Sequence, residues 1–377
     1  MIYTEHKISL NRKEIDSIVN FGGREALFTF LTGDIPPLKK LIYLLFPESL
    51  VKSNADGKIK QLLHMTNNPE GQYKTAYIRK SNGKKREIHK PDPTLKKFQK
   101  AIYIRILKDM PISNYATAYK KGASLRNATA VHIGKPVILK LDIQNFFGSI
   151  PYKTVREMFL KHGFDTDTAT TLTTLVCYKG RLPQGTPTSP AISNIVMREF
   201  DEKIAEFCIQ RNIAYTRYSD DMTFSGEFEK EEILHFVEDN LKKAGFVLNR
   251  KKTQFIKQGQ RQTVTGVVVN KKQQLPKSYR REIRKEIHYC QKYSVQSHIL
   301  HANLTEYMYP NGDAYCHKYL LHLYGKINFA LQINPNDSDM RVYRDYVCQA
   351  LKNVDFREKT IDSRTNSLPS RWEQFGF

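Results

Sequence analysis

The chain lacks several features that mark common classes of protein. No apolar run reaches the roughly 18 residues that a membrane-spanning helix needs, and no basic amphipathic helix stands isolated. The N-terminal residues 1–6 have neither the charged start nor the apolar stretch of a signal peptide. Repeats and low-complexity segments are also absent. These absences argue against a membrane protein and against a secreted one.

Cysteine is scarce and unpatterned. The five cysteines, at 177, 208, 290, 316 and 348, are odd in number and form no Cys-x-x-Cys pair, which suits a reducing cytoplasm. Cys316, His317 and His322 suggest a metal clip, but two further ligands at sensible spacing are missing. A packed helix is the favoured interpretation of this segment.

Acidic residues are few relative to basic ones. Lys and Arg number 60 against 38 Asp and Glu, giving a formal net charge of +22 and an isoelectric point near 9.6. Such a surplus is the electrostatic footprint of a partner with a phosphate backbone. At 377 residues, the chain can hold two or three sub-domains around a sizeable core.

Two adjacent carboxylates, Asp220 and Asp221, stand between apolar residues at the tip of an expected β-hairpin. Like charges side by side repel and raise one another's pKa, so the pair calls for a positive neighbour. A lone Asp-Asp pair is far more often a solvated turn than a metal site. Here, however, Asp142 ends another strand-like run, 137–142. Together these carboxylates are a ligand set for two-metal phosphoryl transfer, with hard oxygens suited to Mg²⁺.

A Pro/Gly-rich loop, 182–190, lies between the two carboxylate stations. Gly185 lets the backbone approach a ligand closely, and Gln184 can hydrogen-bond that ligand. Ser189 and Pro190 suit the N-cap and first position of a helix. The apolar residues of this helix recur every fourth position and predict a buried stripe: Ile192, Val196, Phe200 and Ile204.

In their order and spacing, these stations resemble the motifs of a reverse transcriptase. Residues 141–147 resemble motif A, 182–194 motif B and 218–221 the YxDD box of motif C. Residues 245–249, with the Lys-Lys-Thr that follows shortly after, resemble motif D. The resemblance covers roughly 73–330 of the chain.

Two further elements resemble bacterial retron reverse transcriptases. Residues 264–266 match the retron Val-Thr-Gly triplet, and Asn127 with His132 resembles the retron Asn-Ala-x-x-His element. The sequence departs from the pattern in two places. One extra residue separates Asn127 from His132, and Asn145 stands where a second Asp is common. Neither departure touches the expected metal ligands.

The resemblance implies an α+β fold of the right-hand polymerase type, with fingers, a palm of antiparallel sheet plus helices, and a helical thumb. We expect the following parts: an N-terminal helical extension at 1–65, fingers at 66–135, a palm at 136–270 with part of the fingers inserted around 152–181, and a thumb with a C-terminal RNA-binding region at 271–377. In the extension we expect a polar helix at 12–20. An apolar cluster at 41–46 is expected to pack against the body.

A hairpin is expected where 73–80 and 84–90 flank the turn Ser-Asn-Gly. Its arms are rich in Lys and Arg, and a lysine-protected edge strand is one explanation. In a reverse-transcriptase fingers hairpin, Lys84 or Arg86 would instead cover the triphosphate of the incoming nucleotide. The downstream motifs favour this second interpretation.

The resemblance also assigns roles at the metal site. Asp142 and Asp220 would bridge two Mg²⁺ ions, for which Mn²⁺ can substitute, while Asp221 would complete the charge balance and the carbonyl of Ile143 would add an oxygen. These ions would activate the primer hydroxyl and neutralise the triphosphate of the incoming dNTP.

Further residues would contact the nucleotide. Phe147 occupies the place of the family's steric gate against a ribose 2′-OH, although Phe146 and Phe147 alternate, so that one of them must be core. Gln184 and Gly185 would contact the nucleotide from the loop. Lys251 or Lys252 would protonate the pyrophosphate, and the sequence does not choose between them.

After the palm, 271–290 holds seven basic residues against two acidic ones. The basic residues predicted to bind RNA in this helix are Arg280, Arg281, Arg284 and Lys285. A second helix-like run, 319–331, resembles a thumb. A charge run of this kind is about as often a solvated helix face as a nucleic-acid contact. The interleaved Tyr279, Tyr289 and Tyr293 favour an RNA-binding role for this region. The resemblance implies RNA binding for Asn127 and His132 as well.

The function implied is that of a retron reverse transcriptase. It would copy a cognate structured non-coding RNA into single-stranded DNA, priming from a 2′-OH of that RNA, with dNTPs as substrates and with an effector protein in anti-phage defence. The enzymatic alternative is a group II intron-like or other bacterial reverse transcriptase. The non-enzymatic alternative is an RNA-binding scaffold, which would need a damaged metal site, whereas all three carboxylates are present.

Overall fold

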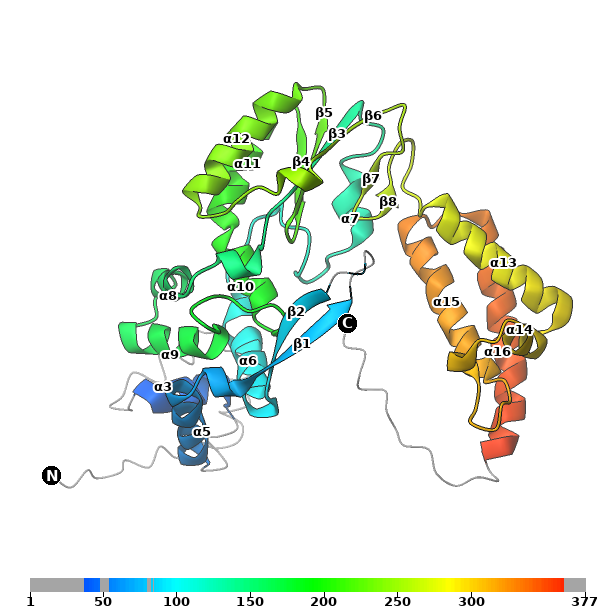
Figure 1. Ribbon diagram of the computed structural model, residues 1–377, viewed down its shortest axis with the longest axis horizontal. Coiled ribbons are helices and arrows are strands. Elements are labelled where there is room, and N and C mark those ends of the chain that lie inside the picture. Colours follow the sequence, from blue (N-terminus) through cyan, green and yellow to red (C-terminus); the bar gives the residue numbers. More distant parts are fainter. Residues whose placement is uncertain (1–36, 48–53, 80–82, 84, 363–377) are drawn as a thin grey trace, which may run out of the picture. The chain divides into compact units, whose positions relative to one another are not determined.

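The computed structural model describes residues 37–47, 54–79, 83 and 85–362, with side chains up to 354. Two compact units form within these residues (Figure 1). Unit 1 combines the chain up to 124 with 136–257, and unit 2 combines 125–135 with the chain from 258 onwards. The mixture of helices and antiparallel sheet confirms the α+β class. The boundaries of fingers, palm and thumb remain predictions, and 125–135 packs with the chain beyond 258.

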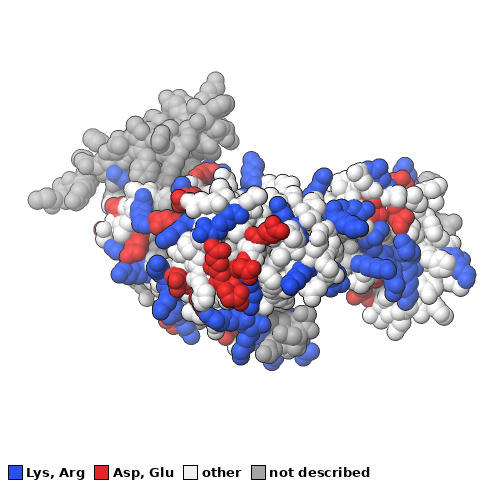
Figure 2. All heavy atoms as spheres, turned by 90° about the horizontal axis from the view of Figure 1, so that it is seen from above, with Lys and Arg blue, Asp and Glu red and all other residues white. Residues whose placement is uncertain are grey.

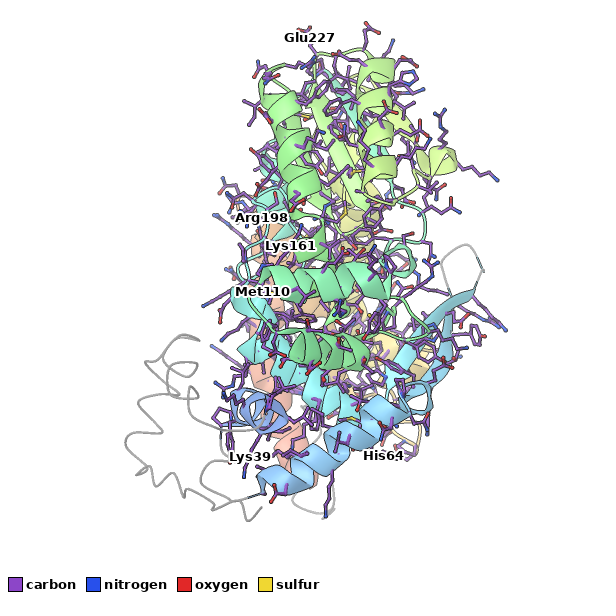
Figure 3. All side chains as sticks on the ribbon, turned by 90° about the vertical axis from the view of Figure 1, so that its left-hand side faces the viewer. Lys39, His64, Met110, Lys161, Arg198 and Glu227 are labelled. Atoms are coloured by element: carbon purple, nitrogen blue, oxygen red, sulfur yellow. The ribbon has the colours of Figure 1, made fainter. Side chains whose placement is uncertain are left out.

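The centre of unit 1 is an antiparallel sheet with strand order β4-β5-β3-β6. Its strands are β3 (Val137–Asp142), β4 (Ala214–Tyr218), β5 (Asp221–Gly226) and β6 (Gln254–Lys257). The apolar run of β3 is buried along most of its length because strands flank it on both sides. Helices α11 (Arg198–Ile209) and α12 (Lys230–Lys243) cover one face of the sheet (Figures 1 and 3). The sheet fixes where the two carboxylate stations meet.

The helical run predicted after the Pro/Gly loop is two helices. Helix α10 (Ser189–Val196) ends at Val196 and α11 begins at Arg198, with Met197 as the cap residue between them. Ser189 is the first residue of α10, so that the cap position belongs to Thr188 and the predicted N-cap was one residue late. The predicted apolar stripe is core, with Ile192 and Ile204 fully buried.

A β-hairpin of β1 (Tyr73–Arg79) and β2 (Lys85–Pro91) forms as predicted, with Arg79 opposite Lys85. Helices α6 (Pro93–Arg105), α8 (Tyr152–Lys161) and α9 (Thr166–Val176) also belong to unit 1. Gln99 of α6 is buried and donates through Nε2 to the Tyr73 hydroxyl at 2.9 Å and to the Leu175 carbonyl at 2.8 Å. This amide ties the base of the hairpin to two helices.

Helices α3 (Pro37–Leu45) and α5 (Ala55–Asn67), which carry Lys39 and His64 of Figure 3, join the core of unit 1. The predicted packing of the apolar cluster is confirmed, since Leu41, Leu44, Leu45 and Phe46 are all buried. The rings of Phe46 and Phe98 lie edge to face with centroids 4.8 Å apart. The predicted helix at 12–20 lies outside the described residues.

Unit 2 is helical apart from one small hairpin. Its elements are α7 (Leu125–Ala130), β7 (Thr263–Val264), β8 (Val267–Val268), α13 (Lys277–Tyr293), α14 (Val295–His301), α15 (Cys316–Ile333) and α16 (Ser338–Asp362). Side-chain amides join its two chain segments: Gln273 donates to the Thr129 hydroxyl at 2.8 Å and Gln262 to the Lys135 carbonyl at 3.0 Å. Cys316 begins a packed helix, as favoured above.

Short 3₁₀ turns complete the described chain at Glu70–Gln72, Leu107–Asp109, Phe147–Ser149, Arg250–Lys252 and Thr305–Tyr307. None of the described helices combines the length and apolarity needed to cross a membrane.

Candidate active site

The three carboxylates meet at one edge of the sheet in unit 1. Asp142 ends β3, Asp221 begins β5 and the two lie opposite each other in the register of the strands. Asp220 lies in the turn between β4 and β5, and its carbonyl accepts from the Ile143 amide at 3.0 Å. Residues far apart in the sequence are thus brought to one place by the pairing of β3 with β5.

These carboxylates lie in a partly buried and strongly acidic setting. Burial, followed by the charge of Asp142, raises the pKa of Asp220. Burial, followed by the charges of Asp220 and Asp142, raises the pKa of Asp221, although Lys140 opposes the shift. The pKa values of Asp220 and Asp221 are therefore raised first by burial, which penalises the charged form, and then by the neighbouring negative charges.

Two residues of the motif D region satisfy both side-chain oxygens of Asp142. The Asn249 amide donates to Oδ1 at 2.9 Å, and the Lys252 ammonium donates to Oδ2 at 2.7 Å. The hydrogen bond to Asp142 is the main cause of the raised pKa of Lys252, so this lysine stays protonated. Lys251 and Lys252 are both exposed, and the contact of Lys252 with Asp142 is what favours Lys252 of the two predicted alternatives. Its role towards the pyrophosphate remains a prediction. Sequence reasoning gave no role to Asn249, although it closes motif D.

In the part of the chain that the structure describes, no three Asp, Glu, His or Cys side chains already form a metal-binding cluster. At Asp142 the positive charge is provided by Lys252. The donor set nevertheless fits a divalent cation, because it offers hard carboxylate oxygens whose mutual repulsion a cation would relieve.

The two phenylalanines after Asp142 differ in burial, and one of them is core, as expected. Phe146 is buried and its ring lies 5.8 Å from that of Phe246. Phe147 is only half-buried. The gate assignment to Phe147 remains a prediction, and Phe146 is the core ring.

The loop before α10 approaches protein backbone. Gly185 has φ +107°, and a Cβ on it would lie 3.3 Å from the His89 carbonyl oxygen and from Cβ of Ile88. The His89 amide donates to the Gln184 carbonyl at 2.8 Å. The structure thus gives Gly185 a packing reason, close contact with β2, where we had predicted room for a ligand. Contacts of Gln184 and Gly185 to a nucleotide remain predictions.

The β1–β2 hairpin carries the residues predicted to cover the triphosphate. Lys84 lies outside the described residues. Arg86 is exposed on β2, opposite Ile78. Its predicted role over the triphosphate remains untested.

In unit 2, the residues of the retron-like element differ in exposure. Asn127 is exposed on α7, whereas His132 is fully buried. Burial, followed by the charge of Lys135, lowers the pKa of His132 to about 4. A neutral, enclosed imidazole is a core residue, so the predicted direct contact of His132 with RNA does not fit this position. The predicted RNA contact of Asn127, which is exposed, remains a prediction.

The four basic residues predicted to bind RNA differ in their contacts. Arg280 is half-buried and pairs with Asp337 at 3.0 Å, and Arg284 pairs with Asp339 at 2.8 Å. Arg281, Arg284 and Lys285 are exposed, and Arg280 is not. Figure 2 shows Lys and Arg side chains spread over the face in view, with a group of Asp and Glu side chains among them. Arg280 and Arg284 fasten α13 to the start of α16 through these ion pairs, and Arg281 and Lys285 are therefore the better candidates for the predicted phosphate contacts.

Sequence reasoning missed a buried ion pair behind the carboxylates. Arg217 of β4 and Asp201 of α11 are both inaccessible to solvent, with Nη2 and Oδ2 2.6 Å apart. An arginine inside the otherwise apolar strand 213–218 was the signal that could have revealed it.

Comparisons with known proteins agree with this site. Residues 78–289 match the family model described as "Reverse transcriptase (RNA-dependent DNA polymerase)". The retron Mx65 reverse transcriptase of Myxococcus xanthus is 31% identical over 250 residues, 61% of this chain and 58% of that protein. The retron Ec86 reverse transcriptase of Escherichia coli is 31% identical over 234 residues, 60% of this chain and 73% of that protein. The match thus spans about six tenths of the Mx65 protein.

Among solved structures, a telomerase from Candida albicans in complex with a fragment of telomeric RNA aligns at a TM-score of 0.42 and 12% identity. That alignment covers 81% of this chain and 66% of the telomerase.

The family model covers more than half of the chain and includes every carboxylate of the site. The chain therefore belongs to the reverse transcriptase family, among the retron reverse transcriptases.

Proposed function

We propose that this protein is an RNA-directed DNA polymerase that copies a cognate structured non-coding RNA into single-stranded DNA, primed from a 2′-OH of the same RNA. The observation that carries the proposal is the meeting of Asp142, Asp220 and Asp221 at the β3–β5 edge. The names of the relatives support the retron class. An effector protein, a role in anti-phage defence and a cytoplasmic location belong to the same proposal.

Asp142, Asp220 and Asp221 would hold two divalent cations, Mg²⁺ in the first place, with the Ile143 carbonyl as a further oxygen. Bound ions of this kind lower the pKa of an attacking hydroxyl and neutralise charge on the phosphates. Because Lys252 contacts Asp142 at 2.7 Å, ion binding requires its ammonium to move away from Oδ2. Lys252 would then be a protonated donor close to the leaving pyrophosphate.

The decisive test is Asp220→Asn. We expect it to abolish Mg²⁺-dependent dNTP incorporation on an RNA template, because losing a metal ligand costs several kcal/mol of transition-state stabilisation, about three decades in rate. RNA affinity, measured in parallel by filter binding, should change little.

The matched control is Asp167→Asn, which removes an exposed carboxylate of α9 in the same unit and should leave the rate unchanged. Near-normal primer extension by Asp220→Asn would refute the assignment of the site. Extension by wild-type protein from any added DNA primer, but never from the RNA itself, would favour the alternative of another bacterial reverse transcriptase.

A further inference from the structure

The turn that carries Asp220 is strained. Between the paired residues Tyr218 and Asp221, the chain turns through only Ser219 and Asp220. Ser219 has φ +60°, whereas Asp220 does not have positive φ. Positive φ at the first turn residue alone is the pattern of a type II′ turn, where glycine is usual. A serine there costs free energy and persists only when its surroundings determine the conformation.

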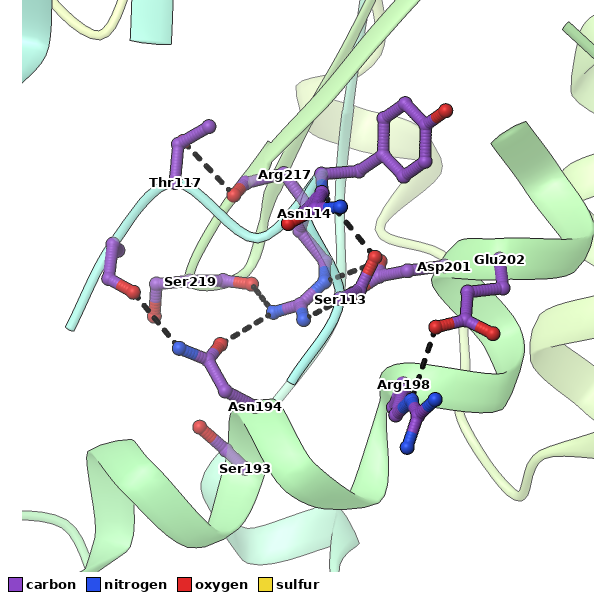
Figure 4. Close-up of polar contacts among 12 residues, drawn as sticks. Ser113, Asn114, Thr117, Ser193, Asn194, Arg198, Asp201, Glu202, Arg217 and Ser219 are labelled. Carbon is purple, nitrogen blue, oxygen red and sulfur yellow. Dashed lines mark hydrogen bonds and ion pairs between the residues drawn. The ribbon is translucent and has the colours of Figure 1, made fainter. Parts of the chain in front are cut away.

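The main restraint on this turn is Arg217, whose side chain is completely buried (Figure 4). Its Nη1 donates to the Ser219 carbonyl at 2.9 Å and to Oδ1 of Asn194 at 3.3 Å. Its Nε and Nη2 donate to the two oxygens of Asp201 at 2.7 and 2.6 Å. The guanidinium thus directs one edge to the charge of Asp201 and the other to the turn.

The groups around Arg217 are themselves fixed. Asn194, near the end of α10, donates through Nδ2 to the Ala118 carbonyl at 2.8 Å, and Tyr215 donates to Oδ1 of Asp201 at 2.8 Å. The Tyr119 hydroxyl donates to the Ser219 hydroxyl at 3.3 Å. Motif B, the 115–119 loop and the motif C turn are therefore connected through one cation.

Stability alone explains this arrangement poorly. Desolvating two charges offsets most of their attraction, and replacing a buried ion pair with apolar residues is often neutral or stabilising. A planar cation with fixed donors does, however, what an apolar residue cannot, since it holds a carbonyl and a carboxylate in set directions. The buried ion pair is therefore better explained by the geometry that it imposes on its neighbours.

We propose that Arg217 is a positioning residue of the carboxylate site: balanced by Asp201, its guanidinium holds the Ser219 carbonyl and so fixes the strained turn that presents Asp220 and Asp221 to divalent cations. This inference rests on the proposed function for the identity of the ligand. It predicts that loss of Arg217 lowers cation affinity and kcat but does not change RNA affinity or the KM for dNTP.

Two variants test it. Arg217→Lys keeps the charge, but a single ammonium cannot span Asp201 and the Ser219 carbonyl. The double variant Arg217→Met with Asp201→Asn removes the ion pair without leaving a buried charge. The amide oxygen that Asp201→Asn introduces can still accept the hydrogen bond from the Tyr215 hydroxyl. The matched control is Arg198→Lys, because Arg198 forms an exposed ion pair with Glu202 at 3.0 Å on the same helix as Asp201 (Figure 4).

The first readout is Mn²⁺ binding without nucleotide, followed by electron paramagnetic resonance of the free ion. We expect both Arg217 variants to lose about tenfold or more in Mn²⁺ affinity and in kcat, as when a residue supporting a metal ligand is removed. High Mn²⁺ should restore part of kcat in both. Arg198→Lys should match the wild type. Thermal unfolding by circular dichroism gives the folded fraction, and the double variant decides if Arg217→Lys does not fold.

Wild-type Mn²⁺ affinity and kcat in either folded variant would overturn the positioning role, as would a loss of kcat that only follows the folded fraction. If the wild type binds Mn²⁺ but makes no DNA on RNA, the proposed function fails, and the Mn²⁺ affinities of the variants still decide on Arg217. If the wild type binds no Mn²⁺, both proposals fall.

Discussion

Hairpin β4–β5 in unit 1 and hairpin β7–β8 in unit 2 both turn through two residues, and each places a residue other than glycine at positive φ. In the first, Ser219 at +60° has its carbonyl held by Arg217 and its hydroxyl by Tyr119. In the second, Thr265 at +45° precedes Gly266 at +85°. The hydroxyl of Thr265 is buried, with no hydrogen-bond partner in the described part of the chain.

Their surroundings differ as well. The β7–β8 hairpin borders a cavity of about 400 Å³ lined by Leu275 and Phe329 among others. A turn with fixed neighbours suits chemistry that is the same for every template. A strained turn beside open space suits an adaptable contact, and the motif it carries is the retron-like triplet. We interpret the first hairpin as serving catalysis and the second as serving template choice, and the predictions below test that division.

The largest expected effect is a loss of stability of unit 2 at acidic pH. Burial lowers the pKa of His132 to about 4 from an ordinary 6.5. A base with a depressed folded pKa contributes stability above its unfolded pKa, and this contribution is lost as pH falls from about 6.5 through 4. Because a difference of one between the folded and unfolded pKa values corresponds to about 1.4 kcal/mol, we expect up to about 3 kcal/mol of unfolding free energy to disappear over this range.

Urea unfolding at pH 7, 5.5 and 4.5 measures this loss, which should be absent in His132→Gln. The control is His301→Gln, since His301 is exposed in the same unit and should keep the wild-type pH dependence. Equal pH dependence in wild type and His132→Gln would show that the buried imidazole does not govern unit 2.

The next effect lies in unit 1. Phe147→Ala should lower the discrimination against ribonucleotides by about 10- to 200-fold, the range for losing a steric contact worth 1–3 kcal/mol. The ratio of kcat/KM for matched ribo- and deoxyribonucleotides measures it, and the change should be the same on every template. If selectivity is unchanged there but shifts in Phe146→Leu, the gate has been assigned to the wrong ring.

A smaller effect separates the two basic pairs of α13. Replacing Arg281 and Lys285 by Ala should weaken RNA binding and reduce synthesis on the cognate RNA more than on a primed homopolymer. The slope of log affinity against log salt concentration should fall by about one for each phosphate that is no longer bound. Replacing Arg280 and Arg284 should mainly lower thermal stability, because Asp337 is left buried without its partner.

All four replacements together should reproduce both effects. Equal losses on the two templates, compared at fixed ionic strength, would mean that these residues only grip phosphates. Template choice would then have to lie around Asn127 or in the 264–266 triplet.

The smallest effect compares the two turns directly. Thr265→Gly should relieve backbone strain and stabilise unit 2 by about 1 kcal/mol or less, a rise in Tm of a few degrees at most. Ser219→Gly should give no such gain, because it also loses the hydrogen bond to Tyr119. Differential scanning calorimetry of both variants decides, and an equal rise in both would erase the distinction between the turns.

What could be predicted from sequence was local. An apolar run ending in Asp142 and a hairpin turning at Asp220 both follow from strand periodicity, and the structure has both strands in place. The arms of the β1–β2 hairpin followed from an Asn-Gly turn in the same way. Element type and the carboxylate stations were therefore within reach.

The features that could not be predicted depend on contacts between residues that are distant in the sequence. The sequence predicts Arg280 and Arg284 as RNA contacts and gives no sign of their ion pairs with Asp337 and Asp339, which lie in the turn before α16 and in its first turn. Burial of His132 arises only when 125–135 packs with the chain beyond 258. Helix periodicity carries no information about which acid of a later segment will meet a given arginine.

The joint between the two units has a consequence for insertions and deletions. Only Pro136 separates Lys135, whose carbonyl is bonded to Gln262 within unit 2, from Val137, which is paired in the sheet of unit 1. A change of one residue in length here would either break the Gln262 contact or slip β3 by one position, and a one-residue slip turns every side chain of a strand to the opposite face. Asp142 would then point away from the β4–β5 turn. The segment 125–135 is thus free to vary by substitution but not by length, and a unit 2 transplanted from a related protein must bring its own copy of this segment, cut to the same residue.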